Sequence, residues 1–305
     1  MSKSLKDRIY QAQCLRNVEP IEYMTPYPNL RGLVEGQNVK HHGKMIYADL
    51  EMTNMDFYSK VQQIANWLVS KGLKPKERVW VHPQDFPFTE LLIFGVWTVG
   101  ASVILAEDHV QGIDHIIDAD LVIEAGPISK LTKGQPDSFE PTYKSHLDDE
   151  ALIFISGGKG LRLSHYNLLV NANDVQRKLD LFDDGKFYVD LEPTSTAWVV
   201  LQAIFPLYTG APMTSKKPDL TIGTKNADYI VDFDWNQIKE SNHLYIIPEN
   251  TAVLSVGDQG LHLTAFEINK DQLTVNGHSV MMGYVDDELN EKVFTGESLV
   301  LQLNR

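Results

Sequence analysis

Hydrophobic residues in the first third of the chain recur at helical spacing and stop at polar or glycine positions. Thr53 followed by Asp56 has the pattern of a capping box, and apolar residues spaced three and four apart follow as far as Gly72. A capping residue, an apolar stripe and a terminal glycine are together typical of an amphipathic helix. We therefore predict a helix that begins after Thr53 and ends before Gly72.

Short apolar runs then alternate with helical stretches. The runs RVWVH, SVIL and LVIE cover residues 78–82, 102–105 and 121–124, and helical patterns cover 88–99 and 110–118. Alternation of strand and helix is typical of crossover connections on a parallel sheet that helices cover on both faces. The sequence thus predicts a layered α/β core with a mostly parallel sheet.

A second set of elements begins at residue 151. ALIFI over 151–155 predicts a buried strand, SGGKG over 156–160 predicts a turn, and Ser164 predicts the N-cap of a helix that ends near residue 178. Another apolar helix is expected over 197–207, before Gly210. The chain beyond it contains short β-like runs separated by Pro, Asn, Asp and Gly, among them HLYII over 243–247.

These patterns divide the chain into two predicted parts. We expect an α/β subdomain over residues 1–215 and a smaller, mostly antiparallel β-rich subdomain over residues 216–305. The 305 residues, of which 43% are hydrophobic, are enough to bury the core that such a protein needs.

Composition narrows the function classes. The formal net charge is −14, and nucleic-acid binding would require clustered Lys and Arg, so we expect no nucleic-acid partner. No apolar run approaches the roughly 20 residues of a membrane span, and the N-terminal segment lacks the apolar stretch of a secretory signal. Cys14 is the single cysteine, which excludes an internal disulfide. A cytoplasmic protein without a membrane span is predicted.

The turn SGGKG has two interpretations. Glycines allow backbone N–H groups to converge on phosphate oxygens, and the Ser156 hydroxyl and the Lys159 ammonium would add donors. Taken alone, the same five residues between two strands are more often a plain β-hairpin turn. Leu161 follows Gly160 where a Walker loop requires Ser or Thr, so a P-loop of that type is excluded.

Three stretches, in the right order, resemble a known family. Residues 46–105, with their helix, strand and Gly-Ala pattern, FISGGKGLRLSHYNLLVNA over 154–172, and SVG with MMGYVDDELNEKVFTGE over 255–297 carry the likeness. The chain resembles the large N-terminal domain of the AMP-forming acyl-adenylate synthetase superfamily, which includes acyl-CoA synthetases, luciferase and non-ribosomal peptide adenylation domains.

The resemblance implies a chemistry and a set of cofactor-binding residues. Members let a carboxylate attack the α-phosphate of Mg·ATP, which releases pyrophosphate and gives an acyl-AMP. ATP and Mg would then be the cofactors, a carboxylic acid the substrate, and a separate C-terminal domain or an acyl carrier protein the partner. The phosphate loop would correspond to Ser156, Gly157, Gly158, Lys159 and Gly160, and Glu297 would take the position of the ribose-binding Asp. Glu249 in YIIPENTA is either the acid of the aromatic-Gly-x-Thr-Glu motif or part of a plain strand.

Several departures from the family pattern leave two functions open. The phosphate loop is shorter, Glu297 replaces Asp, and Thr194 and Ser195 stand where members often have a His after Pro. We also expect that the family's mobile C-terminal domain is absent. No catalytic residue and no metal ligand is assigned. The chain is predicted to be either a shortened adenylate-forming ligase or a catalytically inactive member that binds a ligand or a partner.

Overall fold

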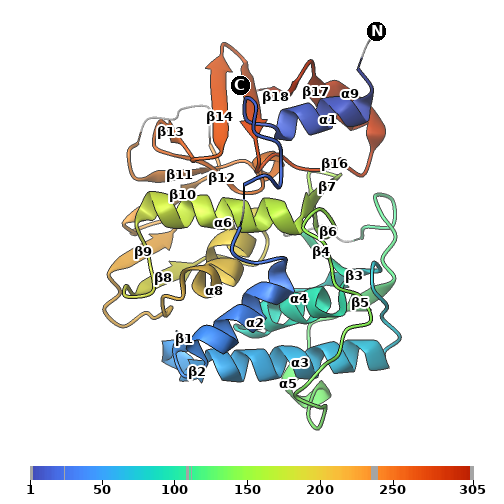
Figure 1. Ribbon diagram of the computed structural model, residues 1–305, viewed down its shortest axis with the longest axis vertical. Coiled ribbons are helices and arrows are strands. Elements are labelled where there is room, and N and C mark those ends of the chain that lie inside the picture. Colours follow the sequence, from blue (N-terminus) through green and yellow to red (C-terminus); the bar gives the residue numbers. More distant parts are fainter. Residues whose placement is uncertain (1–2, 24, 108–109, 111, 235–239, 303–305) are drawn as a thin grey trace.

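The computed structural model describes residues 3–23, 25–107, 110, 112–234 and 240–302. Its described strands form two six-stranded sheets, a four-stranded antiparallel sheet and a small hairpin of β1 (Met45–Tyr47) and β2 (Met52–Thr53). Figure 1 shows the two large sheets with α6 (His165–Leu179) between them, and both chain ends near the third sheet. The predicted layered α/β class with a smaller antiparallel C-terminal sheet is confirmed.

The first sheet holds the crossover units of the first half of the chain. Its strand order is β16-β7-β6-β4-β3-β5, and the four strands from β5 to β6 are parallel. The strands are β3 (Arg78–Val81), β4 (Ser102–Ala106), β5 (Leu121–Ile123), β6 (Glu150–Ser156), β7 (Lys159–Ser164) and β16 (Gly283–Tyr284). Because β6 and β7 are antiparallel neighbours, the turn between them closes a hairpin.

The second sheet combines parallel and antiparallel strands. Its order is β13-β12-β11-β10-β9-β8, and the four strands from β8 to β11 are parallel. The strands are β8 (Phe187–Asp190), β9 (Leu220–Gly223), β10 (Tyr229–Asp232), β11 (His243–Ile246), β12 (Val253–Val256) and β13 (Gln259–Gly260). β8 precedes residue 215 and its neighbours follow it, so this sheet spans the predicted boundary. The division into domains 1–215 and 216–305 stays a prediction.

The third sheet is antiparallel, as expected for the end of the chain. It consists of β14 (Thr264–Asn269), β15 (Gln272–Gly277), β18 (Ser298–Gln302) and β17 (Phe294–Thr295), in that order. α1 (Leu5–Gln13) packs on this sheet, and α9 (Asp287–Val293) precedes β17. HLYII fits the antiparallel expectation on one side only, because β11 pairs antiparallel with β12 and parallel with β10. Leu244, Tyr245 and Ile246 are all buried, as in a strand covered on both faces.

Helices cover the first sheet as their sequence patterns require. α3 (Asn54–Ser70) begins at Thr53, whose side chain accepts from the Asp56 N–H while Asp56 accepts from the Thr53 N–H, so the capping box is confirmed. α4 (Phe88–Val99) packs on β3 and β4, and α2 (Leu30–His41) packs on α3 and α4. In the described parts of the chain no helix has both the length and the apolar character of a membrane span.

The helix predicted over 110–118 is wrong for the residues described there. Residues 114–116 form a turn, in which the Ile116 and Ile117 N–H groups both donate to the Ile113 carbonyl. Ile113 and Ile117 are buried against isoleucines of β4 and β6. The four-residue spacing therefore comes from two buried residues of an irregular segment, and it happens to match the period of a helix. A short α5 (Ile128–Leu131) follows β5.

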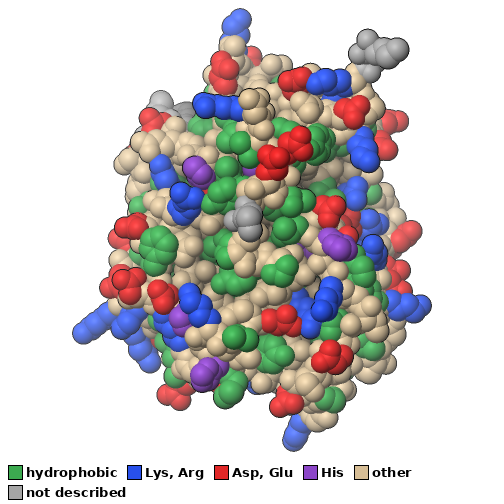
Figure 2. Space-filling view, in the orientation of Figure 1, with side chains coloured by type: hydrophobic (Ala, Val, Ile, Leu, Met, Phe, Trp, Pro, Cys, Tyr) green, Lys and Arg blue, Asp and Glu red, His purple; other side chains and the backbone are tan. Residues whose placement is uncertain are grey.

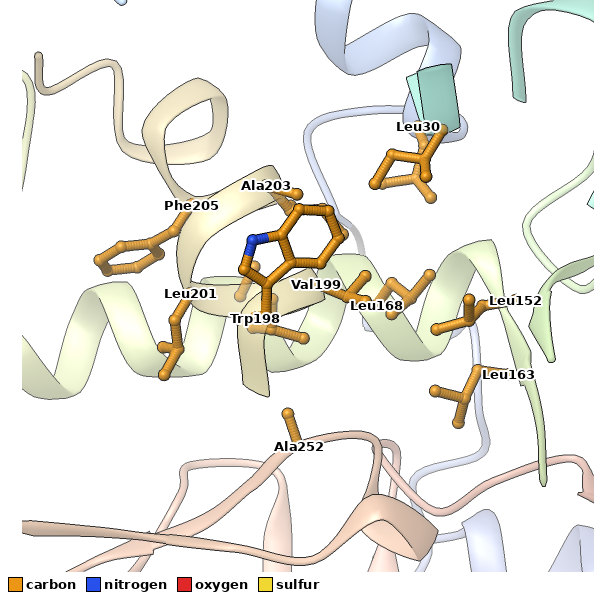
Figure 3. Packing of buried hydrophobic residues seen from close by; sticks show 14 of the residues in the cluster. Leu30, Leu152, Leu163, Leu168, Trp198, Val199, Leu201, Ala203, Phe205 and Ala252 are labelled. Carbon is orange, nitrogen blue, oxygen red and sulfur yellow. The ribbon is translucent and has the colours of Figure 1, made fainter. Parts of the chain in front are cut away.

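The helix predicted over 197–207 is present and has an unusual centre. α7 (Thr196–Trp198) continues into a π-helical stretch, Val199–Ile204, and then into α8 (Phe205–Thr209), which ends at left-handed Gly210. Trp198 is 1% exposed, and Figure 3 shows its indole among buried side chains from several elements, including Leu168 of α6 and Ala252. Short π-helical turns inside helices occur often at functional sites.

Candidate functional site

A pocket of about 290 Å³ lies where strands of both large sheets end. Glu107 follows β4, Thr224 follows β9, Phe233 follows β10, and Pro248 follows β11 after one residue. The remaining described lining residues are Phe154, Leu191, Glu192, Thr194, Ser195 and Thr196. Ligands of α/β proteins bind outside the carboxyl ends of parallel strands. We call this cavity the strand-end pocket and treat it as the candidate functional site.

The walls of the strand-end pocket are apolar, acidic and hydroxyl-bearing. Glu107 and Glu192 contribute exposed carboxylates, and the start of α7 contributes three successive hydroxyl groups. The Ser195 hydroxyl accepts a hydrogen bond from the backbone N–H of Trp198 at 3.2 Å and so caps the helix. The buried Thr196 hydroxyl has no hydrogen-bond partner among the described residues. Buried polar groups without a partner are uncommon in proteins, so this hydroxyl is unmet hydrogen-bonding capacity beside the pocket.

The five residues of SGGKG form a two-residue hairpin. Ser156 pairs with Lys159 at the end of the β6–β7 ladder, which leaves only Gly157 and Gly158 outside the strands. Their φ angles are 54° and 76°, the positive values that a type I′ turn requires at both central positions. A turn this short has few backbone N–H groups that point outward, so it differs from a loop that wraps around phosphates.

The donors of this turn are occupied by Glu107. The Glu107 carboxylate accepts hydrogen bonds from the Ser156 hydroxyl and, at 3.1 Å, from the Gly157 N–H. The carboxylate therefore lies where the phosphate interpretation requires an anion of the ligand. These contacts are exposed, and each contributes on the order of 1 kcal/mol.

Gly160 has a packing role. A Cβ atom at this position would lie 3.0 Å from a methyl carbon of Val285 and 3.1 Å from one of Ile116. The Val285 N–H also donates to the Gly160 carbonyl at 2.8 Å. The need for glycine here is thus explained by close approach of β7 to its neighbours, without a ligand.

Lys159 and Glu249 are brought together by a third residue, Tyr284. The Tyr284 hydroxyl donates to the Glu249 carboxylate at 2.6 Å, and the Lys159 ammonium lies 5.7 Å from the centre of the Tyr284 ring. Burial, together with the Glu249 charge, raises the pKa of Tyr284 well above its ordinary value, so the phenol remains a donor. Glu249 follows Pro248 of the strand-end pocket, which connects this group to the pocket wall.

Glu297 lies in a different part of the molecule. It is in the turn between β17 and β18 of the third sheet, its side chain is 65% exposed, and it forms an ion pair with Lys3. The hairpin, Glu249 and Tyr284 belong to or contact the first sheet. The structure thus brings Lys159 and Glu249 near each other, and Glu297 has a separate partner. Nucleotide binding by these residues stays a prediction.

Sequence patterns alone did not identify Glu107, Glu192 or Tyr284 as site residues. Each of the two glutamates comes directly or soon after an apolar strand run, which is the signal that could have identified them. Tyr284 ends the Met-x-Gly-Tyr stretch that carries part of the family likeness. Among the described residues there is no group of three His, Cys, Asp or Glu side chains that could hold a metal ion.

Comparisons with known proteins identify the fold. No protein-family model and no curated protein sequence matches the chain. Solved structures match it over most of its length. The anthranilate CoA ligase AuaEII in complex with anthranoyl-AMP aligns with a TM-score of 0.71 and 14% identity, over 91% of this chain and 74% of that chain.

Two further structures give the same result. The McyG A-PCP structure with phenylalanyl-adenylate aligns with a TM-score of 0.72 and 13% identity, over 92% of this chain and 75% of that one. O-succinylbenzoate CoA synthetase (MenE) from Bacillus subtilis, in complex with its acyl-adenylate intermediate, aligns with a TM-score of 0.71 and 11% identity, over 89% and 96%. The chain therefore has the fold of AMP-forming adenylation domains and CoA ligases.

Proposed function

We propose that this chain, which has the fold of adenylate-forming enzymes, binds a small molecule in the strand-end pocket and does not adenylate it. One observation carries the proposal: the Glu107 carboxylate occupies the hydroxyl and N–H donors of the hairpin that would otherwise face phosphates. This is the ligand-binding alternative to a shortened ligase.

Electrostatics support this choice. Adenylate formation depends on donors and cations that hold the phosphates while charge develops. Glu107 and Glu192 instead give the pocket negative charge. A phosphate oxygen about 4 Å from an unpaired carboxylate would be repelled by roughly 4 kcal/mol at an effective dielectric constant of about 20. The pocket favours a ligand that donates hydrogen bonds over a triphosphate.

Adenylation is the second candidate, and a specific arrangement favours it. Lys159, Tyr284 and Glu249 form a contiguous group beside the hairpin. The family resemblance implies nucleotide binding for Lys159 and, under one of its two interpretations, for Glu249. For adenylation, ATP and Mg would be cofactors and a carboxylic acid the substrate. A separate C-terminal domain or an acyl carrier protein would be the partner, a choice that the similar McyG A-PCP structure supports. A reducing cytoplasmic location, inferred from the single Cys14, belongs to both candidates.

A ligand screen combined with a pocket-filling variant tests the proposal. Thermal shift would be measured for wild type, for Thr194→Trp in the pocket wall, and for Thr142→Trp at an exposed position outside it. We expect hits among neutral or cationic small molecules that Thr194→Trp loses and Thr142→Trp keeps. A pyrophosphate-release assay with Mg·ATP and a panel of carboxylic acids runs in parallel. Acid-dependent release of pyrophosphate would favour the second candidate.

A further inference from the structure

A second cavity, of about 380 Å³, lies next to the strand-end pocket and shares Leu191 and Glu192 with it. It is bounded by the first turn of α4, by the end of β8 and by the π-helical stretch that contains Gln202. Its volume is within the range of about 300 to 1,000 Å³ that is typical of small-molecule sites. We call it the acidic cavity.

The charged side chains among the described lining residues are all carboxylates, namely Asp85, Glu90, Asp190 and Glu192. Asp85, Asp190 and Glu192 are exposed, whereas Glu90 is 1% exposed. Carboxylates therefore occur both at the solvent-facing rim and on the buried wall of the cavity. A cation that enters would gain from each of these charges, and an anion would be excluded.

Three aromatic side chains, Phe86, Tyr188 and Trp198, also line the acidic cavity. Aromatic faces attract organic cations, and desolvated contacts of this kind are worth about 2 kcal/mol. Carboxylates together with several aromatic rings are the composition expected for recognition of an ammonium group. An inorganic cation would use the carboxylates alone, so the rings favour an organic ligand.

The buried polar groups of the cavity have unused hydrogen-bonding capacity. Gln202 accepts from the Leu191 N–H at 3.1 Å, which orients its amide nitrogen toward Glu90, where it donates at 3.1 Å. Gln202 is the one side-chain hydrogen-bond partner of Glu90 within the described residues. The Trp198 side chain is 1% exposed, and its indole N–H donates no hydrogen bond to any described residue. A ligand with a cationic group for Glu90 and a hydrogen-bond acceptor for the Trp198 indole would satisfy both residues.

We propose that the acidic cavity binds an organic ammonium ion that also carries a hydroxyl group. The ammonium group would lie between the aromatic rings and Glu90, and the hydroxyl oxygen would accept from the Trp198 indole. This site is separate from the function proposed for the strand-end pocket, so either can be present without the other. Burial raises the pKa of Glu90 to about 7, so the cavity gains a further negative charge above that pH.

Choline and its neutral isostere 3,3-dimethyl-1-butanol give a matched pair of probes for this site, because they differ in charge and hardly in shape. Calorimetric titrations at about pH 8 and low salt would compare both compounds on wild type. We expect choline to bind at least about tenfold more tightly than the alcohol, which is the change that loss of one charged contact produces. Equal affinities, or no choline binding at millimolar concentration, would overturn the proposal.

Variants of the chain then locate the binding. Glu90→Gln keeps the shape of the side chain and should weaken choline about tenfold or more. Asp85→Asn, at the exposed rim, should weaken it less and serves as a second variant if Glu90→Gln does not fold. Asp258→Asn, exposed and outside the cavity, is the control and should change nothing. Choline binding that both Glu90→Gln and Asp85→Asn leave intact would place the ligand elsewhere and refute the site.

Discussion

The Glu107 carboxylate accepts a hydrogen bond from the Gly157 N–H at 3.1 Å, so an internal anion occupies the turn between β6 and β7. The same carboxylate accepts from the Ser156 hydroxyl. The turn therefore has the donors of an anion site, and the chain supplies the anion itself. The donors of the turn are therefore used in an intramolecular contact and are not free to bind a phosphate.

Removal of that carboxylate should release the donors. We expect Glu107→Ala to bind pyrophosphate about tenfold more tightly than wild type, because a repulsive charge is lost and two donors become free. Glu140→Ala, which removes an exposed carboxylate elsewhere, should leave the affinity unchanged. Calorimetry measures both. Identical pyrophosphate binding in wild type and Glu107→Ala would mean that Glu107 does not control the turn.

Gly160→Ala should lower the free energy of unfolding by about 1 to 3 kcal/mol, the usual range for overpacking. The added methyl group would meet Val285 at 3.0 Å and Ile116 at 3.1 Å. If that contact is the cause, Val285→Ala should relieve it, and the double variant should lose less stability than the two single variants together. Additive losses in urea denaturation would contradict the packing explanation.

Glu150 bridges two arginines on different strands of the first sheet. Its carboxylate accepts from Arg78 of β3 at 2.9 Å and from Arg162 of β7 at 2.6 Å, and its side chain is 11% exposed. Glu150→Gln should reduce the free energy of unfolding by about 2 to 3 kcal/mol, because it leaves two arginines without their counter-charge. Glu35→Gln, at a carboxylate that is 40% exposed and pairs with Arg31 alone among the described residues, should cost less than about 1 kcal/mol. Equal losses would contradict the difference in burial.

The buried Glu90 predicts how stability depends on pH. Burial raises the pKa of its carboxyl from 4.5 to about 7, so the folded state holds a proton that the unfolded state releases at lower pH. The contribution of Glu90 to stability is present below pH 4.5 and is lost as the pH rises through about 7, a loss of roughly 3 kcal/mol. Glu90→Gln should therefore be more stable relative to wild type at pH 8 than at pH 5. A pH-independent difference in unfolding free energy would contradict the raised pKa.

The sequence was a good guide where a local signal and the tertiary structure agree. Thr53 and Asp56 form the capping box that their spacing predicts, and the strand runs near residues 78, 102 and 151 join one sheet. The helix predicted over residues 110–118 was wrong because Ile113 and Ile117, two buried residues of an irregular segment, have the same spacing as residues on one face of a helix. β11 pairs in parallel with β10 and antiparallel with β12, and its own residues do not encode either direction.

The candidate site was harder to predict than the fold. Lys159 and Glu249 were selected from the family likeness, yet it is Tyr284 that contacts both of them. Tyr284 is far from Lys159 along the chain, and the pairing of β16 with β7 in the first sheet brings the two residues together. Glu107 occupies the hairpin from a neighbouring strand end, and no local pattern of residues 156–160 indicates it. Sites formed where strands from two sheets end combine residues that sequence periodicity treats as unrelated.

Calorimetric titration of the wild-type chain with Mg·ATP and with AMP tests the central claim most directly. Our account predicts no saturable binding of either nucleotide at millimolar concentration, because Glu107 occupies the hairpin donors and the pocket is acidic. Lys159→Ala would then behave as wild type does. Saturable binding of Mg·ATP that Lys159→Ala weakens by about ten- to a hundredfold, and more for ATP than for AMP, would contradict the account and support adenylation.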